Sequence, residues 1–216
     1  VGGGTSGGGK NNTLRLENGG AFVSSNNSAS TSPEVIVGLN AGADNNAIFV
    51  GSGCVFTNLK GVTVGDAGDG NTLTISNGHM YAGGDSRVGE SGDNNTVTIE
   101  AGGDWEIKTH LEIGKNAGAD GNTVTVTGSG STLNIVSYDL KVGINGSTNL
   151  LAIEDGGSVS GARNTYVGSG AGATNNTLRV EGGSFDCTRA ANDGVTYVQN
   201  GSTFASHGTN GTINLR

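Results

Sequence analysis

The sequence predicts an all-β fold, a parallel β-solenoid in which the chain coils so that equivalent strands stack turn upon turn. Three observations predict it: a repeat mostly 24 to 27 residues long, strict alternation of apolar and polar residues within each repeat, and a composition of 42 Gly and a single Pro in 216 residues. A unit this short cannot bury its own apolar face, whereas stacked units bury a continuous column. We expect about seven to eight turns in one domain, 1–216, with degenerate terminal turns over 184–216.

Each repeat opens with an asparagine that begins the alternating stretch. These asparagines are Asn12, Asn46, Asn71, Asn95, Asn122, Asn149 and Asn176. Positions two and four after each one are aliphatic, as in Leu73 and Ile75, while the positions between them are mostly polar, which is typical of a strand with one buried face. A glycine usually follows seven residues after the asparagine, and a β-branched residue with Gly, as in Val88-Gly89, ends the unit. We therefore expect three short strands in each turn.

Composition and charge exclude several classes of protein. Each Gly inside a helix costs roughly 0.5–1 kcal/mol relative to Ala, which excludes a helical bundle, and the glycines lack the three-residue period of collagen. The net charge of −8, from 11 Lys and Arg against 19 Asp and Glu, would repel DNA or RNA. The chain has no apolar run of about 18 residues, so we expect no insertion into a membrane.

Because each repeat position becomes a column in a solenoid, candidate sites are sought in columns. Stacked asparagine amides can donate to one another, so we expect the repeat asparagines to form a structural ladder. A second column carries the aspartates Asp44, Asp69, Asp93 and Asp120, each two residues before a repeat Asn. Stacked carboxylates repel one another, and Ca²⁺ would relieve that repulsion. Asp before Gly or Asn is equally good turn chemistry. Both interpretations stay open, and Ca²⁺ is the only cofactor that the sequence suggests.

Two further columns bear on ligand binding. Ten residues after the first four repeat asparagines stand Phe22, Phe56, Tyr81 and Trp105, which either form core or stack on sugar rings. Outward threonine pairs occupy three successive turns: Thr72, Thr74, Thr96, Thr98, Thr123 and Thr125. This Thr-x-Thr array resembles the ice-binding face of antifreeze β-solenoids, although Thr is also a common exposed strand residue. A surface glycan or ice is therefore a candidate ligand.

No catalytic constellation can be argued from the sequence. The histidines His79, His110 and His207 occupy unrelated repeat positions, and we expect no enzymatic activity. The two cysteines, Cys54 and Cys187, lie about five turns apart, which is too far for a disulfide within one rod. We expect buried thiols, with pairing between neighbouring subunits as the alternative.

The motif of Val-Gly, a Gly/Ala-rich loop and NTVTIEAGG (95–103) resembles the autotransporter-associated β-strand repeats of large bacterial surface proteins. The resemblance covers nearly all of residues 1–183. It implies secretion, a right-handed parallel β-helix, and the role of a stalk, passenger or surface-layer protein.

Both ends of the sequence leave two interpretations: the chain is a piece of a longer protein or fibre, or its copies stack head to tail. The chain begins on a repeat anchor, Val1-Gly2, and 211–216 again alternates, with no helical cap predicted at either end. Open solenoid ends expose strand edges, which pair readily with another chain. We therefore expect an extracellular structural rod on a bacterial cell surface that self-associates head to tail into a filament, stalk or matrix. An adhesin or glycan-binding module is the alternative.

Overall fold

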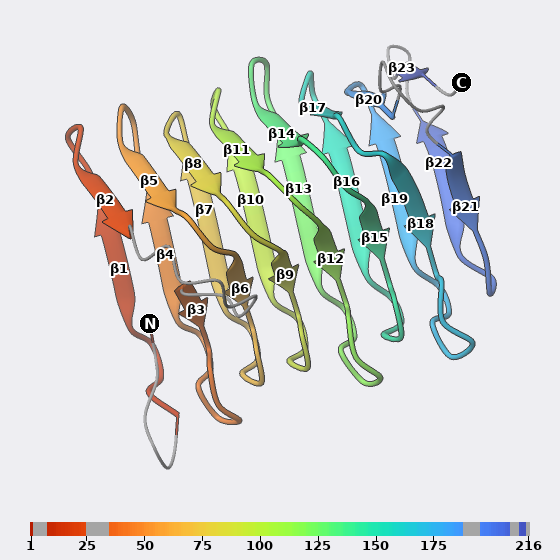
Figure 1. The fold of residues 1–216 in the computed structure, drawn as a ribbon, viewed down its shortest axis with the longest axis horizontal. Helices are drawn as coiled ribbons and strands as arrows, with labels where there is room; N and C mark the ends of the chain where they lie inside the picture. The colour runs from red at the N-terminus through yellow and green to blue at the C-terminus, as the bar shows by residue number, and fades with distance from the viewer. Residues whose placement is uncertain (2–7, 25–34, 188–194, 208–211, 215–216) are drawn as a thin grey trace.

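The computed structural model describes residues 1, 8–24, 35–187, 195–207 and 212–214. Its strands form three sheets, which we call A, B and C (Figure 1). Sheet A contains β1 (Thr13–Leu16), β4 (Ala47–Val50), β7 (Thr72–Ser76), β10 (Thr96–Glu100), β13 (Thr123–Thr127), β16 (Leu150–Glu154), β19 (Thr177–Glu181) and β22 (Thr203–His207). Sheet B contains β2 (Ala21–Ser24), β5 (Val55–Asn58), β8 (His79–Ala82), β11 (Asp104–Ile107), β14 (Thr132–Ile135), β17 (Ser158–Ser160), β20 (Ser184–Asp186) and β23 (Thr212–Asn214). Sheet C contains β3 (Val35–Val37), β6 (Val62–Val64), β9 (Ser86–Val88), β12 (Leu111–Ile113), β15 (Leu140–Val142), β18 (Asn164–Val167) and β21 (Val195–Val198).

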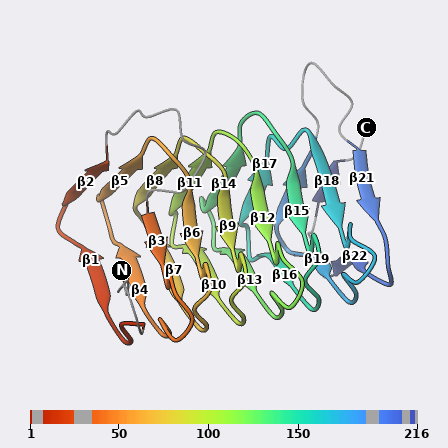
Figure 2. The same ribbon diagram turned by 60° about the horizontal axis from the view of Figure 1, so that its bottom comes forward.

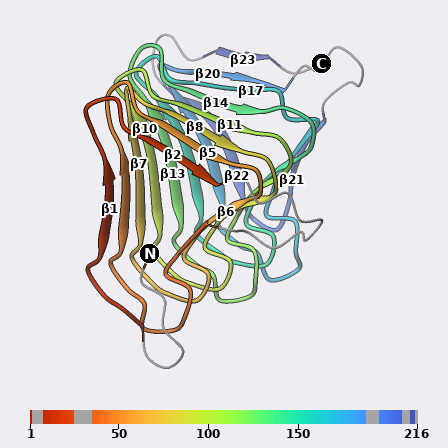
Figure 3. The same cartoon turned by 60° about the vertical axis from the view of Figure 1, so that its left-hand side comes forward.

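Each turn of the coil contributes one strand to sheet A, one to B and one to C, and the next turn repeats that order. Strands pair in parallel with the turns before and after, so that Val97 lies between Leu73 and Val124. Figures 1 and 2 show the turns side by side along a rod, and Figure 3 shows the strands of each sheet stacked behind one another. The predicted all-β parallel solenoid is confirmed. The described residues contribute eight strands to sheet A, eight to sheet B and seven to sheet C, one of each per turn.

The aliphatic positions of the repeat form the core. Strands β7, β10 and β13 alternate between half-exposed and buried residues along their whole length. Leu73, Ile75, Val97 and Ile99 point inward and are at most 1 % exposed. Burying a side chain of this size stabilises the fold by about 1.5–3 kcal/mol, and each turn repeats the contribution. The alternation therefore explains why a chain with a low apolar content folds.

The aromatic column predicted from a fixed spacing is wrong at one of its four members. Phe22, Phe56 and Trp105 are in register and face the core, but their partner in the intervening turn is Met80, and Tyr81 points outward. The cause lies in the corner between sheets A and B. This corner has two consecutive left-handed residues in some turns, such as Ala101-Gly102, but only Asn77 before β8. One residue fewer reverses which side chains face inward.

Cys54 and Cys187 are both buried in the core, and no disulfide joins them. This agrees with the expectation of buried thiols within one rod.

Candidate functional site

The repeat asparagines form a continuous hydrogen-bond ladder beside sheet A. In most turns the side-chain Nδ2 donates to the Oδ1 of the next asparagine, over 2.9 to 3.1 Å. The backbone N–H of each asparagine also donates to that Oδ1, as from Asn95 to Asn122 at 2.9 Å. The amide-to-amide bond is absent at one rung, where Asn122 Nδ2 is buried without a partner. Ser202 takes the place of the next asparagine after Asn176, and its Oγ accepts the Asn176 N–H at 3.3 Å.

The glycine of each Val-Gly anchor packs directly against this ladder. A Cβ added to Gly65 would lie 2.0 Å from the Nδ2 of Asn95, and one added to Gly89 would lie 2.1 Å from that of Asn122. These glycines also have positive φ, for instance 79° at Gly65. The two sequence signatures, Val-Gly and the repeat asparagine of the next turn, are thus halves of one interlock. We call it the Gly–Asn interlock.

The aspartate column is a second ladder. The Oδ1 of each aspartate accepts the backbone N–H of the equivalent residue one turn later: Asp44 from Asp69, Asp69 from Asp93, and Asp93 from Asp120, at 2.8 to 3.1 Å. Ser147 continues it by accepting from Thr174. A hydrogen bond from Lys10, with one from the Asp69 backbone, lowers the pKa of Asp44. Within the part of the chain that the structure describes, no group of three His, Cys, Asp or Glu side chains could hold a metal ion. The aspartate side chains thus take part in the hydrogen bonding of the turns.

The six threonines of the predicted face are brought together. Thr72, Thr96 and Thr123 are in register, as are Thr74, Thr98 and Thr125, and all six are half-exposed. Each row ends at an apolar residue in the adjoining turns. Ala47 and Phe49 lie beside the array on one side, and Leu150 and Ala152 lie on the other. The array is therefore a short uncharged patch in the middle of sheet A.

A histidine, an aspartate and a threonine meet at the start of sheet B, which the sequence did not predict. His79 Nδ1 lies 2.7 Å from Asp104 Oδ2, and the Thr132 hydroxyl donates to Asp104 Oδ1. The carboxylate stands between the other two groups, so the imidazole does not contact the hydroxyl. Activating a hydroxyl nucleophile requires direct contact with a base. This column is a polar relay across three strands, and it offers no activated nucleophile.

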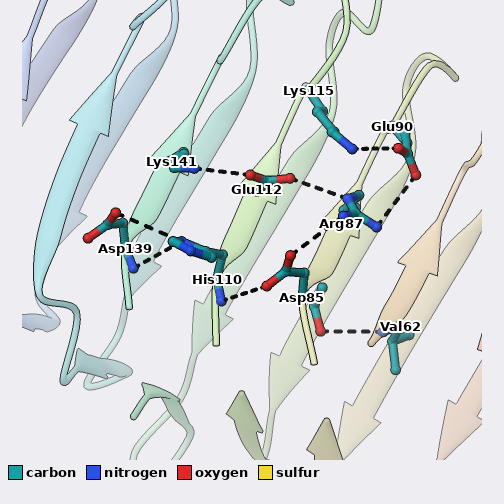
Figure 4. Close-up of polar contacts among 10 residues, drawn as sticks. Val62, Asp85, Arg87, Glu90, His110, Glu112, Lys115, Asp139 and Lys141 are labelled. Carbon is teal, nitrogen blue, oxygen red and sulfur yellow. Dashed lines mark hydrogen bonds and ion pairs between the residues drawn. The ribbon is translucent and has the colours of Figure 1, made fainter. Parts of the chain in front are cut away.

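The outer face of sheet C carries a lattice of ion pairs, the feature that sequence reasoning missed (Figure 4). Glu112 lies between Arg87, 3.2 Å away, and Lys141, 3.1 Å away, on three adjacent strands. Glu90 extends it by pairing with Lys115 at 2.6 Å and with Arg87 at 3.7 Å. The side chains of Arg87 and Glu112 are only 11 % and 9 % exposed. We call this set the ionic lattice. The sequence does carry a signal for this lattice, because Arg87, Glu112 and Lys141 each directly precede a Val-Gly or Ile-Gly anchor.

Two aspartates near the lattice, Asp139 and Asp66, have pKa values shifted by their surroundings. Burial tends to raise the pKa of Asp139, but the hydrogen bond and charge of Arg163, with Asn164 and His110, outweigh it and lower that pKa. The pKa of Asp66 is raised, first by burial and then by the negative charge of Glu90. Each lattice cation already has a carboxylate partner. The arrangement is suited to holding neighbouring strands together.

Comparison with known proteins finds no family model, curated protein or solved structure that matches this chain. None of the residues that the structure describes belongs to a helix long and apolar enough to cross a membrane.

Proposed function

We propose that this protein is a structural component of a bacterial cell surface, an extracellular rod that builds a filament, stalk or matrix by stacking head to tail on a second copy. The extracellular setting rests on the resemblance of its repeats to those of bacterial surface proteins. The stacking rests on the geometry of the first layer of the rod.

The first layer leaves apolar core partly uncovered. Leu14 and Phe22 are only partly buried, whereas their counterparts one turn later, Ile48 and Phe56, are at most 1 % exposed. The Phe22 ring stacks on Phe56 with centroids 4.4 Å apart, and the same kind of contact could continue on its other side. A further layer of strands would bury these side chains as the inner turns do.

The backbone of β1 offers hydrogen-bonding groups to such a layer. Ala47 N–H donates to the Asn12 carbonyl and Gly51 N–H donates to the Leu16 carbonyl, so these carbonyl groups face β4. In a parallel ladder the intervening residues, Thr13 and Arg15, direct their N–H and C=O groups to the opposite side. Among the residues that the structure describes, β1 is the edge strand of sheet A. This edge carries the proposal, because a strand edge is a template for pairing.

The opposite end of the rod presents a fitting surface. Sheet A ends at β22, where Phe204 is partly buried against the core and Ser202 occupies the ladder position. Stacking would place β22 of one copy beside β1 of the next, with Phe204 near Leu14. The contact is heterologous and does not close on itself, so it generates an open filament.

Electron microscopy and sedimentation velocity of the purified chain over a range of concentrations test the proposal. We expect rods of variable length that grow with concentration. Thr13→Pro removes an outward N–H without touching the bonds from β1 to β4 and should leave single rods, while Thr13→Val, which keeps the N–H, should still assemble. Rods of one uniform length at every concentration would overturn the proposal, as would assembly by the Thr13→Pro variant.

A glycan-binding role is the second candidate function. A groove beside Phe49 at the corner of sheets A and B favours it.

A further inference from the structure

A groove lies at the corner between sheets A and B, beside a glycine in an outward column. The register aligns Glu17, Gly51, Ser76 and Glu100 in one outward column, and only Gly51 lacks a side chain there. The Phe49 ring lies beside this position, since a Cβ on Gly51 would be 2.8 Å from its Cε1. The groove has a volume of about 540 Å³ and is formed by the corners of three successive turns.

The groove combines one aromatic ring with groups that donate and accept hydrogen bonds. The guanidinium carbon of Arg15 lies 4.1 Å from the Phe49 ring centroid, and Arg15 Nε lies 2.7 Å from Glu17 Oε1. On the opposite wall, Asn77 Nδ2 donates to Ser52 Oγ at 2.8 Å. The Glu17 side chain, which lines the groove, is 48 % exposed, so its carboxylate remains accessible to a ligand.

We infer that this groove binds a neutral pyranose unit of a glycan. A pyranose has an apolar C–H face that packs on an aromatic ring and a rim of hydroxyl groups that pair with amide, hydroxyl and carboxylate side chains. The volume lies within the range of about 300–1,000 Å³ that is usual for small-molecule sites.

Charge selects a neutral sugar over a charged one. An anionic sugar would approach the Glu17 carboxylate on a molecule of net charge −8. A cationic ligand would compete with Arg15, which already occupies one face of the Phe49 ring. A neutral sugar meets neither obstacle.

Titration of the purified protein with the methyl glycosides of glucose, mannose, galactose and N-acetylglucosamine tests this inference, by calorimetry and saturation-transfer NMR. We expect at least one of the four to bind. Phe49→Thr, which installs the residue found in the same column at Thr74, should weaken that binding at least tenfold. Gly51→Glu, matching Glu100, should do the same, because its Cβ would lie 2.8 Å from the Phe49 ring and displace it. Thr98→Ser, two turns further along the same column, is the control and should change the affinity less than twofold.

Binding of none of the four glycosides would overturn the inference, and so would equal affinities for the Phe49→Thr and Thr98→Ser variants. Melting curves of the variants establish that each is folded before titration. The groove includes Glu17 of the first turn, next to the proposed stacking edge, so the titration is repeated on Thr13→Pro. Glycoside binding by single rods of that variant separates this inference from the fate of the filament.

Discussion

Single residues in the left-handed backbone region decide which side chains the repeat accepts. The position before each ladder residue has φ between 55° and 68° in every described turn. Glycine and asparagine occupy it almost throughout, since they tolerate this conformation. Thr148, with φ of 57°, is the exception, and a β-branched residue is strained there.

Thr148→Asn should therefore raise the free energy of unfolding by about 1 kcal/mol, because it installs a tolerated residue without changing the turn. The reciprocal substitution, Asn94→Thr at the equivalent position of an inner turn, should lower it by a similar amount. Urea unfolding followed by circular dichroism measures both. A gain from Asn94→Thr, or a loss from Thr148→Asn, would contradict the assignment of strain.

The alternation of Leu73 and Ile75 with polar neighbours sufficed to predict sheet A and the solenoid. The same pattern placed the asparagine ladder, because a repeat residue of one type at one position must stack. The Tyr81 error arose because the corner before it has one residue fewer, and glycine-rich corners carry no apolar signal that would reveal this. The groove at Phe49 was equally hidden. It is lined by a glycine and an aromatic ring of the same turn, and neither belongs to the repeat pattern.

Among the elements, the strands of sheet C are joined by ion pairs as well as by backbone bonds. Glu112 on β12 faces cations on both neighbouring strands, Arg87 on β9 and Lys141 on β15. Because Arg87 is nearly buried, loss of Glu112 leaves it only the longer contacts to Asp85 and Glu90, both 3.7 Å, and should cost more than loss of an exposed pair.

Glu112→Gln should reduce the free energy of unfolding by about 2–3 kcal/mol. The double variant Arg87→Met/Glu112→Leu removes both buried charges and should recover to within about 1 kcal/mol of the original protein. Lys10→Met, which breaks the exposed pair with Asp44, is the matched control and should cost clearly less than Glu112→Gln. Denaturant unfolding gives all three values. A double variant that is less stable than Glu112→Gln would show that Arg87 and Glu112 act independently.

For the molecule as a whole, the aspartate ladder predicts how stability responds to Ca²⁺. The carboxylate Oδ1 atoms already accept backbone N–H groups along successive turns. We expect the melting temperature in millimolar Ca²⁺ to agree with that in excess chelator to within about 1 °C, because a ligand stabilises a fold only by binding it.

Asp93→Ser is the informative comparison, since Ser147 shows that a hydroxyl can hold the same position. A Ca²⁺-dependent rise of several degrees that this substitution abolishes would establish the aspartates as a metal site.

The Gly–Asn interlock has a consequence for how the chain tolerates change. Asn46 follows Asn12 by 34 residues and Asn95 follows Asn71 by 24, yet both asparagines take the same place in the ladder. The interlock thus fixes the register of each turn against its neighbour, whatever the length of the loop before it. A longer or shorter loop therefore does not shift the register of the turns that follow. Insertions of whole segments are consequently tolerated wherever the interlock that follows them is intact, and the rod can acquire new loops without losing its alignment.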